Sequence, residues 1–167
     1  VQNIVSNEFK AAGHKLCLLK PEYDENGLPE AESLLGLFDY VTELLRSGAA
    51  VAAYTPGMGG VAEAVMKMAF GNGIGVKFAE NVTMDELFGY AYGAFVLEMT
   101  EGTVGTVIGV TTEGDFSYGD QVLTHEAVLN AYEDKLESVY SCNIPAPKQP
   151  MENFSFEATQ RKAPAIK

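Results

Sequence analysis

Short apolar segments alternate with longer segments of helical period along residues 14–141, and this order limits the folds open to the chain. Strands are expected where apolar residues follow one another directly, and helices where they recur every three or four positions. The expected order is strand 14–20, helix 30–47, strand 49–54, helix 61–70, strand 74–78, strands 94–100 and 103–111, strand 121–123 and helix 124–141. This order predicts an α/β (α+β) fold, in which helices pack on a mixed β-sheet.

The helix over 30–47 is the clearest element, and Gly48 ends it. The next segment, 49–54, is small and apolar throughout, which predicts a central strand covered on both faces. Each of the three expected helices has an apolar face. These faces comprise Leu34, Leu37, Phe38, Val41, Leu44 and Leu45; Val61, Val65, Met68 and Ala69; and Val128, Leu129, Tyr132, Leu136, Val139 and Tyr140.

The segments around Glu101-Gly102 have the pattern of an antiparallel hairpin, with strands over 94–100 and 103–111. Residues 84–88 are too short to assign to a helix or a strand. Residues 115–120 combine acidic, aromatic and glycine residues, which predicts a solvated turn. The sequence thus predicts that strands 94–100 and 103–111 lie next to each other in the sheet.

Charge excludes several classes of function. The chain has 11 basic and 23 acidic residues, a formal net charge of −12. Because nucleic acids and anionic membranes carry negative charge, we expect neither to be a partner. The sequence has no apolar run of 18 residues and no signal peptide pattern, so we expect a cytoplasmic protein. It begins without methionine, and we expect either a processed protein or a piece of a longer one.

The reactive residue types are few and scattered. Cys17 lies in an apolar run and is expected to be a buried thiol, whereas Cys142 begins a polar segment, so no disulfide framework is expected. His14 is expected to be a hydrogen-bonded structural residue, and His125, after the helix cap Thr124, to be exposed. Cysteines and histidines show no metal-ligand spacing, and Asp115 and Asp120 fit a turn better than a metal site. We therefore predict no catalytic set and no metal site.

The glycine-rich turn over 55–60 is the one feature that indicates function. It joins an apolar strand to a helix, and free amides at a helix start favour an anion. Thr55, Gly57, Gly59 and Gly60 are therefore the candidate contacts to a phosphate or nucleotide. The spacing is neither G-x-G-x-x-G nor a P-loop. The alternative is a purely structural turn, whose glycines provide positive φ and close packing of strand and helix.

Residues 142–167 have a different composition from the rest. Pro145, Pro147, Pro150 and Pro164 interrupt a segment without periodicity. We therefore expect a lobe over 1–141 and an extended linker or tail over 142–167.

Three stretches together identify a family resemblance: 8–15 (EFKAAGHK), 21–24 (PEYD) and 54–75 (YTPGMGGVAEAVMKMAFGNGIG). They resemble the C-terminal lobe of the second synthetase half of the long, single-chain phosphoribosylformylglycinamidine synthases. The likeness covers the whole chain, and 142–167 resembles the linker toward that family's glutaminase domain. Each synthetase half of that family is similar to aminoimidazole ribonucleotide synthetase, so the resemblance implies the fold of that enzyme's C-terminal domain.

The resemblance also implies a reaction. That family uses ATP and Mg²⁺ to convert formylglycinamide ribonucleotide and glutamine to formylglycinamidine ribonucleotide in purine biosynthesis. It implies that the partners of this lobe are the nucleotide-binding lobes and glutaminase domain of the same polypeptide. Related lobes often carry an Asp directly before the Gly-Gly of this turn, where this chain has Met58. The resemblance therefore implies a structural copy of the site, with at most an auxiliary phosphate contact.

Three hypotheses follow. The first is a ligase fragment that is inactive alone and binds no cofactor tightly. The second is a free-standing module that binds a phosphorylated metabolite or nucleotide at residues 55–60. The third is a scaffolding domain with an exposed apolar face, which a homodimer of the fragment would cover.

Overall fold

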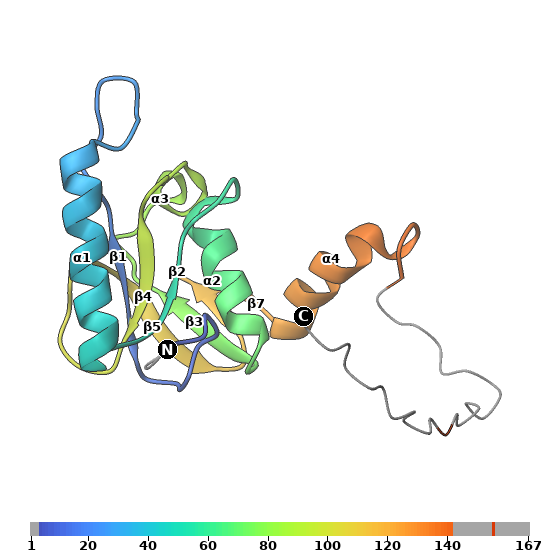
Figure 1. Cartoon of the computed structure of the whole chain (residues 1–167). Coiled ribbons are helices and arrows are strands. Elements are labelled where there is room, and N and C mark those ends of the chain that lie inside the picture. The colour runs from blue at the N-terminus through green and yellow to red at the C-terminus, as the bar shows by residue number, and fades with distance from the viewer. Residues whose placement is uncertain (1–3, 142–154, 156–167) are drawn as a thin grey trace, which may run out of the picture.

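The computed structural model describes residues 4–141 and residue 155, and its eleven helices and strands form one mixed sheet with helices packed on it (Figure 1). The strands occur in the order β2-β4-β1-β5-β3-β6-β7. The expected α/β (α+β) class is confirmed. The bounds are β1 (Lys15–Leu19), α1 (Ala31–Ser47), β2 (Ala50–Tyr54), α2 (Gly60–Phe70), β3 (Ile74–Phe78), α3 (Met84–Phe88), β4 (Phe95–Met99), β5 (Thr106–Glu113), β6 (Phe116–Tyr118), β7 (Gln121–Leu123) and α4 (His125–Glu137).

The two faces of the sheet carry separate cores. Successive residues of a strand point to opposite faces, so Leu16 and Leu18 of β1 pack with α2, and Cys17 and Leu19 pack with α1. The α2 side holds Val61, Val65 and Met68, all buried as expected, and the α1 side holds Leu37 and Val41. In Figure 1, α1 and α2 accordingly lie on either side of the strands.

The expected position of the 49–54 strand is wrong. Within the described residues, β2 pairs with β4 alone and forms an edge of the sheet. Its small apolar side chains contact the two cores, Ala52 on the α2 side and Ala50 on the α1 side. A run of small apolar residues therefore predicted correctly that both faces of this strand are covered. It does not indicate whether the strand is hydrogen-bonded along both edges.

The expected hairpin around Glu101-Gly102 is also wrong. The strands β4 and β5 do not pair, because β1 lies between them and pairs antiparallel with both. The two strands therefore run parallel, and residues 100–105 must pass along β1 from one end to the other. Val104 packs into the α1-side core on the way. At Gly105, with φ of 54°, an added Cβ would lie 2.5 Å from the Leu18 carbonyl oxygen, so the crossing requires glycine.

Other local expectations have mixed outcomes. Gly48 ends α1 with φ of 81°, and Thr124 caps α4 by accepting a hydrogen bond from the Ala127 amide, both as expected. Phe38, expected on the buried face of α1, is 42 % exposed and packs edge-on against Phe95. The segment 115–120, expected to be a turn, contains β6, which forms a hairpin with β7. Cys142 and the expected 142–167 tail lie outside the described residues, apart from Ser155.

A buried carboxylate joins the N-terminal segment to the middle of the sheet. Glu98 of β4 is fully buried and accepts three hydrogen bonds. They come from the amides of Lys10 (2.8 Å) and Ala11 (3.1 Å) and from Nδ1 of His14 (2.6 Å). His14 is thus the hydrogen-bonded structural residue that the sequence predicts.

We expect Glu98→Ala to lower the free energy of unfolding by about 3 kcal/mol, because three donors lose a buried acceptor. Urea denaturation followed by circular dichroism measures the change. Glu113→Ala, at an exposed position of β5, is the control and should stay within about 0.5 kcal/mol. A loss below about 1 kcal/mol for Glu98→Ala would show that the bonds are dispensable.

Candidate functional site

The glycine-rich turn lies where β2 leads into α2, next to the end of α3 (Figure 1). Thr55 is exposed, Gly57 and Gly59 are half-buried, and Gly60 is buried. Met58, where the resemblance implies an acid, is 80 % exposed and so makes little contact with the protein. The turn therefore presents an apolar side chain to its surroundings.

Gly60 allows α2 to approach α3. Its φ is 69°, and an added Cβ would lie 2.7 Å from the carbonyl oxygens of both Leu87 and Gly89. Its amide donates to the Gly57 carbonyl at 3.1 Å, which closes the turn. Gly60 thus meets the structural requirements, positive φ and close packing, that the sequence offered as the alternative to ligand binding.

The side chain of Glu63 occupies the start of α2. Its Oε2 accepts from the Gly59 amide at 2.7 Å, and its Oε1 pairs with Lys67 Nζ at 2.6 Å. The hydrogen bond from Lys67, and after it the one from Gly59, hold the pKa of Glu63 below its ordinary value of 4.5. A carboxylate of α2 itself therefore takes the amide and the positive helix end that an external anion would use.

The assignment of Thr55, Gly57, Gly59 and Gly60 to a phosphate contact stays a prediction. In the structure, the Glu63 carboxylate would compete with a phosphate for the Gly59 amide. Sequence reasoning missed Glu63 and Lys67. Their signal was the i, i+4 spacing of an acid and a base, with the acid in the first turn of the helix.

Exposed aromatic residues lie at and just after the end of α3, against whose backbone Gly60 of the turn packs. Phe88 and Tyr90 are 62 % and 71 % exposed, and the rings of Tyr90 and Tyr92 stack with centroids 5.5 Å apart. The hydroxyl of Tyr23 donates to the Tyr92 carbonyl at 2.9 Å and so fastens the 21–29 loop beside these rings. This end of the molecule therefore offers flat apolar surface suited to contact with a ring or with another protein surface.

The remaining sequence candidates are structural. His125, expected to be exposed, is half-buried between the rings of Phe70 and Phe116 because α4 begins against α2 and β6. Asp115 accepts a hydrogen bond from the His125 amide at 3.1 Å. Within residues 4–141 and 155, no three histidine, cysteine or acidic residues gather where they could hold a metal ion. No helix among these residues is long and apolar enough to span a membrane.

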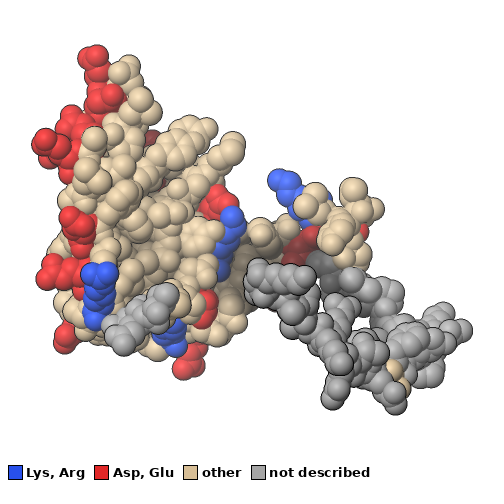
Figure 2. Space-filling view, in the orientation of Figure 1, with Lys and Arg blue, Asp and Glu red and all other residues tan. Residues whose placement is uncertain are grey.

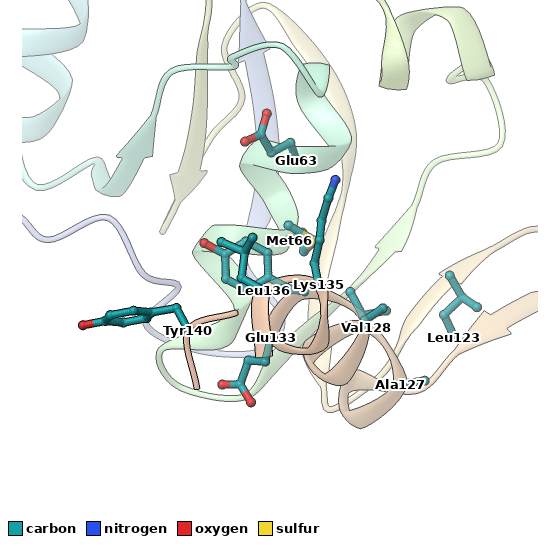
Figure 3. A pocket seen from close by; sticks show the side chains of 11 residues that line it. Glu63, Met66, Leu123, Ala127, Val128, Glu133, Lys135, Leu136 and Tyr140 are labelled. Atoms are coloured by element: carbon teal, nitrogen blue, oxygen red, sulfur yellow. The ribbon is translucent and has the colours of Figure 1, made fainter. Parts of the chain in front are cut away.

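An apolar groove runs between α2 and α4, and sequence reasoning did not anticipate it (Figure 3). Its volume is about 810 Å³. Two smaller hollows of about 370 and 240 Å³ continue it past β6 and β7 to α3. The signal was present in the apolar stripe that the sequence predicts for this helix, because no residue of α4 is buried.

Comparison with known proteins supports the fold at low sequence identity. No family model matches the chain. Among solved structures, the Thermotoga maritima phosphoribosylformylglycinamidine synthase II matches 93 % of this chain with a TM-score of 0.62 and 11 % identity. T. maritima PurL complexed with FGAR matches 93 % with a TM-score of 0.59 and 12 % identity, and PurL complexed with ATP matches 75 % with 0.56 and 14 %.

These matches extend over only part of the solved proteins. This chain spans 31 % of the synthase II chain, 32 % of the FGAR complex and 27 % of the ATP complex. It therefore has the fold of about one third of PurL, in agreement with the synthetase-like fold that the resemblance implies.

We expect Gly60→Ala to lower the free energy of unfolding by about 3 kcal/mol or more. The left-handed backbone costs an alanine about 1 kcal/mol, and the contacts with two carbonyl oxygens add to this cost. Gly102→Ala is the matched control, because Gly102 has φ of 70° and nothing within 4 Å of its added Cβ. Equal losses in the two variants, measured by urea denaturation, would contradict a packing requirement at Gly60.

The Glu63 contacts should make stability depend on pH. A lowered pKa in the folded state adds stability above pH 4.5, and that stability is lost as pH falls through the folded-state value. We expect Glu63→Gln to cost about 0.5–1 kcal/mol at pH 7 and progressively less below pH 4.5. Urea denaturation from pH 3 to 7 measures this, with exposed Glu43→Gln as the control. A cost independent of pH would contradict the charged interaction.

Proposed function

We propose that this chain is a lobe of an ATP-dependent ligase of the phosphoribosylformylglycinamidine synthase type. In this proposal it is the C-terminal lobe of the second synthetase half. The complete enzyme converts formylglycinamide ribonucleotide, glutamine and ATP to formylglycinamidine ribonucleotide in the cytoplasm. The supporting observation is the match of 93 % of the chain to about a third of the T. maritima synthase II. The 54–75 stretch supports the same family independently of the fold.

The chemistry of the turn favours a structural lobe over a catalytic one. The Gly59 amide already binds Glu63, and Met58 stands where related lobes carry an acid. Among residues 4–141 and 155, no three acids, histidines or cysteines gather into a site that would hold a metal ion through protein side chains alone. We therefore assign no step of the reaction to this chain, and we place nucleotide and metal binding in the other lobes.

The exposed aromatic end gives the lobe a surface for its partners. Met58 of the turn, Phe88 at the end of α3, and Tyr90 and Tyr92 just after it are each more than 40 % exposed. Exposed apolar and aromatic side chains that form a large patch mark interaction sites. We propose that the nucleotide-binding lobes of the same polypeptide cover it.

A free-standing module that binds a phosphorylated metabolite at residues 55–60 is the competing proposal. An incoming phosphate would have to displace the Glu63 carboxylate from Gly59 and from Lys67. This competition favours the ligase lobe, because the displaced carboxylate and the phosphate would repel each other.

The size of the natural polypeptide tests these proposals. Antibodies raised against the chain should detect, in extracts of its source organism, a protein several times larger than the 18.0 kDa of this sequence. The immunopurified protein should convert formylglycinamide ribonucleotide with ATP and glutamine, whereas this chain alone should show no turnover.

An 18 kDa natural product that binds ribose 5-phosphate or ATP in calorimetry would contradict the ligase lobe and support the module. The Glu63→Ala variant supplies the control, since it frees the Gly59 amide while leaving the rest of the turn unchanged.

A further inference from the structure

Helix α4 carries an apolar stripe that the described residues leave uncovered. Leu136 of α4 is 63 % exposed, Val139 and Tyr140 just after the helix are 84 % and 82 % exposed, and none of the α4 residues is buried. In Figure 1, α4 projects away from the sheet, and its first turn packs against α2 and β6. Covering these side chains would remove apolar surface from water, which favours the binding of a segment that fits over α4.

The groove beside α4 has an apolar lining and mostly acidic charge at its borders. Met66 of α2 and Val128 and Leu136 of α4 face it, and Glu63 and Glu133 lie at its edges with Lys135 (Figure 3). It continues into the hollow formed by Phe78, Phe88 and Phe116. This is an elongated surface, suited to a peptide segment with spaced apolar side chains.

We propose that the segment 151–156 of this same chain binds in the groove between α2 and α4. The segment brings Met151, Phe154 and Phe156 together within six residues. These side chains would cover the apolar stripe of α4, and the segment would link the helix back to α2.

Charge supports this occupant over a second copy of the chain. Residues 142–167 contain four basic residues (Lys148, Arg161, Lys162 and Lys167) and two acidic ones (Glu152 and Glu157), a net charge of +2. The chain as a whole carries −12, so residues 1–141 carry −14. Two copies of this acidic chain repel each other. The segment 151–156 itself contains Glu152, but Lys148 precedes it and Arg161 and Lys162 follow it, and these basic residues are attracted to an acidic rim.

Length permits the binding without strain. Phe154 follows Tyr140 by 14 residues, a maximum reach of about 45 Å. Tyr140 itself borders the groove. The loop to be closed is short, so its closure entropy is modest.

Disulfide trapping tests the proposal in the full chain. The background is Cys142→Ser, since Cys17 is buried and unreactive. Ser155→Cys, between the two phenylalanines, is combined with Ala131→Cys, which lines the groove. The control combines Ser155→Cys with Asn130→Cys, a neighbouring exposed position that does not line the groove. The one-residue difference in loop length is negligible.

We expect the Ala131→Cys pair to form an intramolecular disulfide at least tenfold faster than the control, at low micromolar protein and mild oxidation. Adding Phe154→Ser and Phe156→Ser should reduce the rate to that of the control. Equal rates for the two pairs, or a rate unaffected by the serine substitutions, would overturn the proposal. A disulfide-linked dimer would also overturn it and assign the groove to a second copy. Circular dichroism verifies the fold of every variant. The result does not depend on whether the ligase proposal holds.

Discussion

The buried Glu98 carboxylate is the interaction on which the centre of the structure depends. A carboxylate without partners would be unstable beside β1, so its burial requires donors. The N-terminal segment supplies them, and this fixes the segment over the end of the sheet. Phe9 is then fully buried, with its amide bound to Met68 and its carbonyl to Asn72. One ionisable residue in β4 thus holds the N-terminal segment against both the sheet and α2.

Local features of the fold could be predicted from the sequence, and long-range pairing could not. The apolar face of α1 and the stop at Gly48 depend on neighbouring residues, and both were predicted. The insertion of β1 between β4 and β5 depends on residues about 80 to 95 positions apart, and no local pattern reports it. The chain does bend at Glu101-Gly102, with Gly102 at positive φ, but the bend does not form a hairpin. It belongs to the 100–105 connection, which passes along β1.

The candidate site shows the same division. The turn, its glycines and the helix that follows were predicted. The sequence did not predict that the Glu63 carboxylate occupies the Gly59 amide, although Glu63 and Lys67 have the i, i+4 spacing of a helical ion pair. Figure 2 shows acidic residues gathered mainly on the α1 side and few charges on the central part of the visible face. The net charge of −12 predicted an acidic protein, but only the folded arrangement reveals where apolar surface is left for a partner.

The position of β1 has a consequence for synthesis of the chain. Its residues emerge from the ribosome before those of the other strands of this sheet, and both neighbouring strands come much later, since Lys15 pairs with Met99 and Val110. At about 5–20 residues per second, β1 waits on the order of 5–20 s for β5. During this interval the Leu16–Leu19 segment is an unpaired apolar strand, which is the kind of segment that chaperones bind. The topology therefore makes the nascent lobe dependent on protection until its fifth strand is complete.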